Sequence, residues 1–547
     1  MKKILVLLMF VLGTNMVIGQ APSLKGWHHM DLVQDSVPGI SSNKAYAEIL
    51  KGRKSTPVIV AVIDGGVDYM HEDLKDIMWH NPGEIPGDGI DNDKNGYIDD
   101  VYGWNFIGGK DGRNVNQDNL EVTRLYRKYD YKYKNADPAK LNKKQKKEYD
   151  LYLKTKEIVE KERKSAAEKL DKFSMRKKSL FKSIDAVAEA LKKNNLTFEQ
   201  MDSLKFEEGS ELASSLMMIK RIAMTQPDLN SFDAIKEYLD KQFKGAIDYY
   251  STKVLYQYNV DFDPRNIVGD NYGDSSERYY GNNDVKGPDA SHGTHVSGII
   301  AAVRNNGIGM NGIADNVKIM AVRVVPDGDE RDKDVANGIR YAADNGAKII
   351  NMSFGKAFKW DKKVVDKAVR YAEKKGVLLI HAAGNDAEDN DKIIHYPSDN
   401  YEKRMWFCRK NAKNWLEIGA NSYKNDSMFV AGFSNYGKKN VDLFAPGVSI
   451  YSTTPENTYA SYNGTSMATP VVAGVAAVLK SYFPKLSARQ LKEIIMDSVQ
   501  KKNMKVIKPG SDGSLVDFSD LSVTGGEVNL YNALMLAIQK YGNKAAK

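Results

Sequence analysis

The sequence predicts an α/β fold: a doubly wound, mostly parallel sheet that is flanked by helices and interrupted by a large α-helical insertion. Three observations lead to this prediction. Short apolar runs rich in β-branched residues, typical of buried parallel strands, occur at residues 58–63, 317–322, 348–353 and 377–382. Helical patterns at 334–345 and 362–375 separate the later runs, and strands that alternate with helices pack as a doubly wound sheet. The third observation is a long stretch that breaks this alternation.

That stretch covers residues 114–260, where glycines are few and apolar residues recur at helical rather than strand spacing. We therefore expect one domain formed by 21–113 and 261–547, with a helical insertion at 114–260. The insertion is basic, because residues 121–200 contain 23 Lys and Arg against 13 Asp and Glu, in a chain of net charge +8. A polyanion or an anionic membrane surface could bind it, but interspersed Lys and Glu more often form a solvated helical face, and no nucleic acid is expected. Two interpretations of the insertion stay open, a passive addition and a cap, regulator or partner-binding module.

The first 20 residues resemble a secretory signal peptide, with Lys2 and Lys3, an apolar stretch at 4–12, and Val17 and Gly19 before a predicted cleavage site. The apolar stretch is shorter than the ~20 residues that span a bilayer, so we expect export rather than anchoring. The single cysteine, Cys408, excludes a disulfide within the chain. The sequence predicts a secreted or periplasmic protein without a transmembrane segment after cleavage.

The last part of the chain predicts further helices. A helix of small residues follows Ser466 and contains Pro470 near its start, where proline is tolerated because first-turn amides lack helical partners. Ser487 and Gln490 have the spacing of a capping box before an apolar helix, and residues 528–538 form a final helical pattern.

Three separated blocks carry the residues suited to catalysis. They are 63–68 (Ile-Asp-Gly-Gly-Val-Asp), 291–298 (Ser-His-Gly-Thr-His-Val-Ser-Gly) and 463–470 (Asn-Gly-Thr-Ser-Met-Ala-Thr-Pro). A serine hydroxyl needs a base that takes its proton, and the base needs an acid that holds its tautomer and stabilises its cation. Asp64, His292 and Ser466 fit these roles. Their order along the chain resembles that of the subtilisin-like serine proteases, the subtilases of peptidase family S8.

This resemblance implies a subtilisin-like fold and an exported serine endopeptidase that hydrolyses protein or peptide substrates through an acyl-enzyme intermediate. No cofactor is required for that chemistry. The resemblance assigns catalysis to His292 and leaves His295, one helical turn later, as a packed residue. It also implies that Asn385 donates a hydrogen bond to the oxyanion, and that a backbone segment pairs with extended substrate, namely Ser353, Phe354 and Gly355.

The chain departs from the family pattern in two places. Gly65 stands where the family usually has Ser or Thr, and we expect a looser turn after Asp64. Only residues 21–63 separate the predicted signal from the acid block, too few for the usual inhibitory propeptide and a first strand. The maturation route is therefore not predicted.

Residues 88–100 begin like a calcium loop, with oxygen-bearing side chains at alternate positions and a glycine that allows a sharp turn. A structural Ca²⁺ ion would use some of Asp91, Asp93, Asn95 and Asp99. Position twelve, counted from Asp91, is Tyr102 rather than Glu, so the loop is not a complete EF-hand. A surface turn rich in Asp, Asn and Gly is the equal alternative.

The sequence gives only a weak indication of which substrate residue is preferred at the cleavage site. Acidic residues near Asn385, namely Asp386, Glu388, Asp389 and Asp391, favour a basic substrate side chain, but solvated loop carboxylates are the more common case. A binding or scaffold protein of the same fold, with its cleft capped by the insertion, is the alternative function, and deletion of 114–261 would separate the two. Cys408 has no recognisable base near it in the sequence, which disfavours a cysteine protease.

Overall fold

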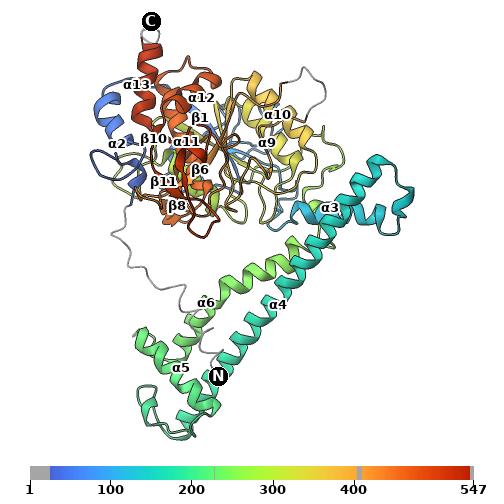
Figure 1. Ribbon diagram of the computed structural model, residues 1–547, viewed down its shortest axis with the longest axis vertical. Helices are drawn as coiled ribbons and strands as arrows, with labels where there is room; N and C mark the ends of the chain where they lie inside the picture. Colours follow the sequence, from blue (N-terminus) through green and yellow to red (C-terminus); the bar gives the residue numbers. More distant parts are fainter. Residues whose placement is uncertain (1–24, 227, 403–408, 543–547) are drawn as a thin grey trace. The chain divides into compact units, whose positions relative to one another are not determined.

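The computed structural model describes residues 25–226, 228–402 and 409–542 (Figure 1). The chain forms two compact units, one made of Met1–Asn116 and Arg265–Lys547 and the other of Gln117–Pro264. The predicted signal peptide and Cys408 lie outside the described residues. In the part of the chain that is described, no helix is both long and apolar enough to cross a membrane.

The first unit contains a nine-stranded sheet in the order β10-β13-β7-β6-β5-β4-β1-β3-β2. All its neighbours pair in parallel except β10 and β13, which confirms the predicted mostly parallel sheet. The strands are β1 (Val58–Asp64), β2 (Gly103–Asn105), β3 (Val317–Arg323), β4 (Ile349–Met352), β5 (Leu378–Ala382), β6 (Trp415–Asn421), β7 (Leu443–Pro446), β10 (Gln500–Lys501) and β13 (Gly526–Glu527). Two antiparallel pairs lie outside this sheet: β8 (Ile450–Thr454) with β9 (Thr458–Tyr462), and β11 (Lys505–Ile507) with β12 (Leu515–Asp517).

Most helices of this unit lie between its strands in the order of the sequence. They are α2 (Ser42–Ala45), α7 (Arg265–Val268), α8 (Ser291–Ala301), α9 (Asp332–Asp344), α10 (Lys362–Lys374), α11 (Thr465–Tyr482), α12 (Ala488–Asp497) and α13 (Leu530–Tyr541). Short turns of tighter or wider helix are η1 (Trp27–His29), η2 (Tyr46–Leu50), η3 (Lys75–Ile77) and η7 (Phe518–Asp520).

Two predicted helix starts can be compared with the structure. The capping box at Ser487 and Gln490 is present and begins α12. The final helix begins at Leu530 rather than 528, because the Val528 amide donates to the Phe444 carbonyl and Asn529 caps the helix through the Asn532 amide.

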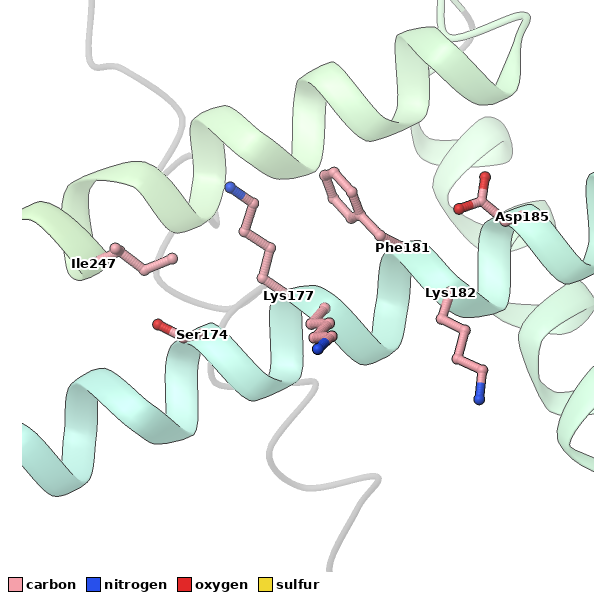
Figure 2. Close-up of a pocket in the computed structure, with 7 residues that line it drawn as sticks. Ser174, Lys177, Phe181, Lys182, Asp185 and Ile247 are labelled. Atoms are coloured by element: carbon pink, nitrogen blue, oxygen red, sulfur yellow. The ribbon is translucent and has the colours of Figure 1, made fainter.

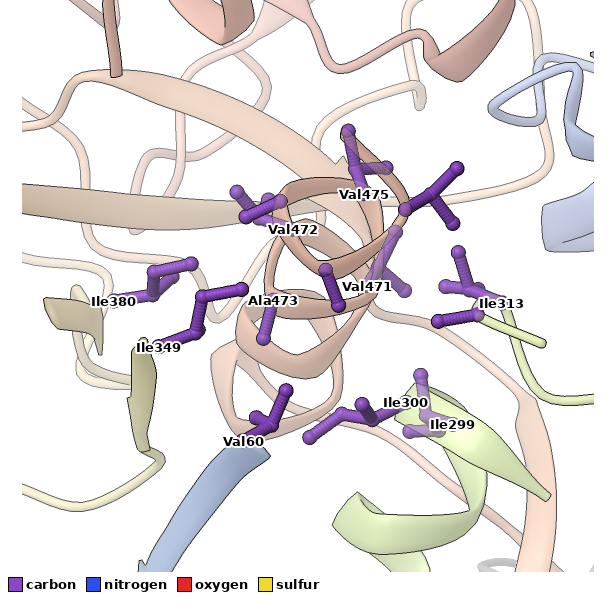
Figure 3. Close-up of a cluster of buried hydrophobic side chains, with 14 of the residues drawn as sticks. Val60, Ile299, Ile300, Ile313, Ile349, Ile380, Val471, Val472, Ala473 and Val475 are labelled. Carbon is purple, nitrogen blue, oxygen red and sulfur yellow. The ribbon is translucent and has the colours of Figure 1, made fainter. Parts of the chain in front are cut away.

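Both faces of the sheet are buried, as expected for parallel strands covered by helices. Along β1, Val60 and Val62 belong to the core shared with α8 and α11, and Ala61 and Ile63 belong to the core shared with α9 and α10. Figure 3 shows the apolar side chains of α11 packed against strand residues such as Val60, Ile349 and Ile380. The small residues of α11 allow this close approach, and a Cβ on its Gly474 would lie 2.7 Å from Ile313.

The second unit is helical, as the sequence predicts for the insertion. It contains α3 (Glu121–Tyr133), α4 (Lys143–Lys193), α5 (Glu211–Thr225) and α6 (Phe232–Thr252), with the short turns η4 (Pro138–Lys140), η5 (Met201–Ser203) and η6 (Lys253–Gln257). Asn142 and Gln145 form a capping box that begins the long helix α4. Apolar residues of α4, α5 and α6, among them Ile184, Ile219 and Ile235, form a core that belongs to this unit alone.

Candidate active site

The three sequence blocks meet at the carboxyl edge of the sheet, where loops after parallel strands form binding crevices. Asp64 is the last residue of β1, His292 is the second residue of α8, and Ser466 is the second residue of α11. The Nδ1 atom of His292 lies 2.8 Å and 2.9 Å from the two carboxylate oxygens of Asp64. With Nδ1–H donating to Asp64, the Nε2 atom carries the lone pair that a general base needs.

The electrostatics of this pair favour a protonatable histidine. Burial alone lowers the pKa of His292, but the charge and hydrogen bond of Asp64 outweigh it and raise the pKa above 6.5. Asp64 is only 2% exposed, whereas the His292 side chain is 43% exposed and remains open to a reactant. The arrangement can therefore take up a proton and stabilise the resulting imidazolium.

Ser466 is held differently from what a complete triad requires. Its hydroxyl donates to the Ser353 carbonyl at 3.1 Å, and no hydrogen bond joins it to His292, although both residues are described. The hydrogen bonds of a catalytic site often tighten only when substrate is bound.

Pro470 explains a second contact between the same two serines. It is the sixth residue of α11, inside the helix rather than in the first turn as predicted. Because proline has no N–H, the Ser466 carbonyl lacks its usual helical donor four residues later. The Ser353 hydroxyl donates to that carbonyl at 2.9 Å instead. Ser353, predicted as part of a substrate-binding segment, thus helps to hold the backbone of Ser466.

Asn385 lies beside the start of α11, as an oxyanion donor should. Its Oδ1 atom accepts hydrogen bonds from the Thr465 amide at 2.9 Å and from the Thr465 hydroxyl at 3.0 Å. These bonds fix the orientation of the side-chain amide and leave Nδ2 without a hydrogen-bond acceptor in the described structure. A Cβ built on Gly464 would lie 3.6 Å from Nδ2 and 3.5 Å from the Ser466 amide, so the two donors border the same space.

The predicted substrate-binding segment follows β4 directly. Ser353 is buried, Phe354 is half-buried and Gly355 is exposed. The next residue, Lys356, forms an antiparallel bridge with Tyr396. Phe354 and Gly355 therefore connect Ser353, which contacts Ser466, to this bridge.

His295 is packed away from the reacting groups. It is fully buried, its ring stacks on Tyr462 with centroids 4.3 Å apart, and its Nε2 atom lies 3.1 Å from the Ala460 carbonyl. Burial lowers its pKa to about 4, so it is neutral at the pH at which a base would act.

The turn after Asp64 is not loose, contrary to the expectation from Gly65. The Gly65 amide donates to the Asp64 carboxylate at 2.8 Å, and the Gly65 carbonyl accepts from Arg323 Nε at 2.7 Å. Sequence reasoning missed Arg323, although a charged residue at the end of a mostly apolar strand is a detectable signal. It also missed Thr465, whose contacts with Asn385 depend on segments 80 residues apart.

The structure brings together three of the four residues predicted to bind calcium, because Asp91 and Asp93 each accept from the Asn95 amide at 3.0 Å. Asp91 accepts from the Asn95 and Gly96 amides, and Asp99 accepts from the Gly87 and Gly89 amides. Asp93 also lies with Glu84 and Asp100, and one carboxylate oxygen of each of these three residues is within 4.8 Å of the others. Burial raises the pKa of Asp100 to about 6. The donor set that could surround a cation therefore differs from the predicted one, and calcium binding stays a prediction.

The four acidic residues after Asn385 have different partners. Asp389 pairs with Lys392 at 2.9 Å, and Asp391 accepts from the Lys439 and Asn440 amides. Asp386 and Glu388 form a group with His395, and Glu388 lies 2.9 Å from the His395 ring.

A separate hollow lies in the second unit between α4 and α6 (Figure 2). It is lined by Ser174, Lys177, Lys178, Phe181, Lys182, Asp185 and Ile247. Lys177 pairs with Asp240 and Asp185 pairs with Lys236, both within this unit. None of the residues predicted for catalysis lines this hollow.

Comparisons with known proteins find relatives that match about a third of this chain. Thermitase of Thermoactinomyces vulgaris is 44% identical over 191 residues, which are 35% of this chain and 61% of the relative. Subtilisin BL of Lederbergia lenta is 39% identical over 202 residues, 37% of this chain and 67% of the relative. Alkaline elastase YaB of a Bacillus strain is 40% identical over 202 residues, 37% of this chain and 48% of the relative. The chain thus spans about half to two thirds of the curated relatives it matches.

Among solved structures, a protease from Pseudoalteromonas arctica aligns with 26% identity over 47% of this chain and 78% of its own, with a TM-score of 0.37. The model of the subtilase family matches residues 55–513, on both sides of and across the helical unit. The chain belongs to the subtilase family.

Proposed function

We propose that this protein is an exported serine endopeptidase. The observation that carries the proposal is the pairing of the His292 imidazole with the Asp64 carboxylate at 2.8 Å, at an edge of the sheet that also holds Ser466 and Asn385. Family membership supports the same activity. Export rests on the predicted signal peptide in residues 1–20.

The first half of the reaction forms an acyl-enzyme. After its hydroxyl turns from the Ser353 carbonyl, Ser466 attacks the scissile carbonyl carbon and His292 Nε2 takes the hydroxyl proton. Asp64 holds the Nδ1–H tautomer and stabilises the imidazolium. The carbonyl oxygen becomes an oxyanion that accepts from Asn385 Nδ2 and the Ser466 amide, which lies in the first turn of α11 where amides have no helical acceptor.

Collapse of this tetrahedral intermediate completes the acyl-enzyme, and hydrolysis of the acyl-enzyme then releases the product. The imidazolium gives its proton to the leaving amine as the C–N bond breaks, which leaves an ester on Ser466. Water then attacks that ester with His292 as base, and the same donors stabilise the second oxyanion. Ser466 regains its proton as the acid product leaves.

The proposal is tested with phenylmethylsulfonyl fluoride, which sulfonylates an activated serine. We expect the wild-type protein to lose casein hydrolysis and to carry one label, located by mass spectrometry on the peptide that contains Ser466. Ser466→Ala and His292→Ala should both stay unlabelled, because one lacks the nucleophile and the other lacks its base. His80→Ala is the matched control, since His80 is exposed and its ring contacts Tyr102, and it should label normally. A folded wild type that neither hydrolyses casein nor takes up label would contradict the proposal.

Asn385 provides a second expected result. Asn385→Ala should lower kcat about 10²–10³-fold with little change in KM, because the oxyanion donor acts mainly in the transition state. Asn385→Asp separates rate from stability, since it keeps the acceptor for Thr465 and removes the donor to the oxyanion. Both variants should therefore be slow, and the aspartate variant should retain more of its resistance to urea. Wild-type kcat in Asn385→Ala would exclude this role.

A further inference from the structure

Arg323 is a buried cation without a carboxylate partner. It is 2% exposed, and no carboxylate of a described residue lies within ion-pair distance of it. Its guanidinium instead donates to three neutral acceptors: Nε to the Gly65 carbonyl at 2.7 Å, Nη1 to Asn105 Oδ1 at 3.2 Å and Nη2 to the Val115 carbonyl at 2.5 Å. Burying a charge is costly unless it is well hydrogen-bonded, so these three bonds are needed to retain it.

The position of Arg323 in the sheet places it beside the acid. β3 lies between β1 and β2, and Arg323 is the register partner of Asp64 on one side and of Asn105 on the other. All three residues end their strands. The guanidinium can therefore bond to the turn that follows each neighbouring strand.

The turn that Arg323 holds is tightly packed. A Cβ on Gly66 would lie 2.1 Å from the Lys286 carbonyl, and a Cβ on Gly293 would lie 2.2 Å from the Gly66 carbonyl. Gly287 covers the guanidinium itself, because a Cβ there would lie 2.3 Å from Arg323 Nε. Because these positions are glycines, the turn after Asp64, the start of α8 and the Arg323 guanidinium can pack this closely.

We propose that Arg323 is a positioning residue for the catalytic acid: by fixing the Gly65 carbonyl, it holds the Asp64 carboxylate opposite His292 Nδ1. The two hydrogen bonds of Gly65 act on opposite sides of that residue, its N–H on the Asp64 carboxylate and its carbonyl on Arg323. Loss of the second bond frees the turn, and with it the direction of the carboxylate. This role rests on the proposed function, because it acts through the Asp64 and His292 pair.

Arg323 keeps its charge under working conditions. Burial lowers its pKa, Asp284 and Asp289 oppose that effect, and the resulting value is about 10. The same guanidinium also bonds to Val115, two residues before the helical unit begins at Gln117. One side chain thus joins the acid turn to the segment that leads into the insertion.

The test compares Arg323→Met with the same substitution at Arg304, a half-buried arginine. Arg304 also donates to a backbone carbonyl, that of Gly312, and its guanidinium lies 4.0 Å from the Tyr46 ring centroid, away from the catalytic groups. We expect Arg323→Met to lower kcat/KM about 10²-fold per folded molecule, as displaced catalytic groups do. The acid limb of its pH profile should shift downward, because Asp64 raises the pKa of His292. Arg304→Met should leave that limb unchanged.

A second readout does not depend on activity. The titration of His292 by NMR reports its pairing with Asp64 directly, and its pKa should fall in Arg323→Met and stay unchanged in Arg304→Met. An inactive wild type would overturn the proposed function, and the NMR titration would still decide the role of Arg323. A wild-type His292 pKa in folded Arg323→Met overturns the positioning role.

If Arg323→Met does not fold, Arg323→Lys provides the test. An ammonium keeps the charge but presents its donors at one point, and it cannot reach the three acceptors that the planar guanidinium spans. We therefore expect about a tenfold loss in kcat/KM and a smaller fall of the His292 pKa. Wild-type values for both quantities would overturn the proposal.

Discussion

Ser466→Ala is expected to lower kcat about 10⁶-fold, and Asp64→Asn is expected to lower it about 10⁴-fold, magnitudes taken from the triad of subtilisin and related serine proteases. The first substitution removes the atom that forms the acyl-enzyme. The second keeps the shape of the acid but removes its charge and favours the wrong histidine tautomer, because an amide can donate to Nδ1. Single-turnover hydrolysis of a peptide substrate measures both losses.

The two losses should not add. Without Ser466 there is no proton for His292 to accept, so the Ser466→Ala, Asp64→Asn double variant should be no slower than Ser466→Ala alone. Ser461→Ala is the matched control, since Ser461 is an exposed serine of β9 five residues earlier in the chain. Its kcat should equal that of the wild type. Additive losses in the double variant would mean that the two residues act independently and do not form one catalytic unit.

The sequence was informative where a local pattern determines structure. The apolar runs that became β1, β3, β4 and β5 were recognisable because buried parallel strands have apolar residues on both faces. The short strands β10 and β13 were not predicted, since each has two residues and is defined by pairing with distant chain. The start of α12 followed its capping box, and the final helix was misplaced by two residues because the Val528 amide still bonds to the Phe444 carbonyl of β7.

The candidate site, like the fold, could be predicted only where a local sequence pattern identifies the residues. The three blocks around Asp64, His292 and Ser466 could be found from residue types and their order. Arg323 and Thr465 could not be assigned, because their contacts join segments far apart in the sequence. The loop at 88–100 remains a prediction: Asp91 and Asp99 accept backbone amides there, and Glu84 and Asp100, which lie with Asp93, were not among the predicted ligands.

His28→Leu is expected to stabilise the protein, which is unusual for a buried substitution. His28 is 1% exposed, and neither of its ring nitrogens has a hydrogen-bond partner among the described residues. An unsatisfied buried polar group costs about 1–3 kcal/mol, and leucine has a similar volume without that cost. The free energy of unfolding at pH 7.5 should therefore rise by about 1–3 kcal/mol. Urea denaturation in the Ser466→Ala background measures it without self-digestion.

The gain in stability from His28→Leu should increase at acidic pH. Burial, together with the charges of His29, His295 and Arg304, lowers the pKa of folded His28 well below 6.5. The unfolded chain then binds a proton below pH 6.5 that the folded chain does not bind, so His28 destabilises the wild type as the pH falls. Each pH unit below 6.5, down to the folded pKa, costs about 1.4 kcal/mol. The advantage of His28→Leu should thus be about 2 kcal/mol larger at pH 5.0 than at pH 7.5.

The neighbouring residue, His29, separates the effect of missing hydrogen bonds from the effect of a lowered pKa. His29 is equally buried, and burial lowers its pKa to about 3, but its ring nitrogens lie 2.7 Å from the Ser42 hydroxyl and 2.8 Å from the Asn311 carbonyl. His29→Leu should therefore lose stability at pH 7.5 because it breaks both hydrogen bonds, yet it should show the same relief in acid. If His28→Leu is also destabilised at pH 7.5, the His28 ring has hydrogen bonds in solution. If neither variant shows relief in acid, these histidines are protonated in the folded state, and the segment at Trp27–His29 is more open than its burial indicates.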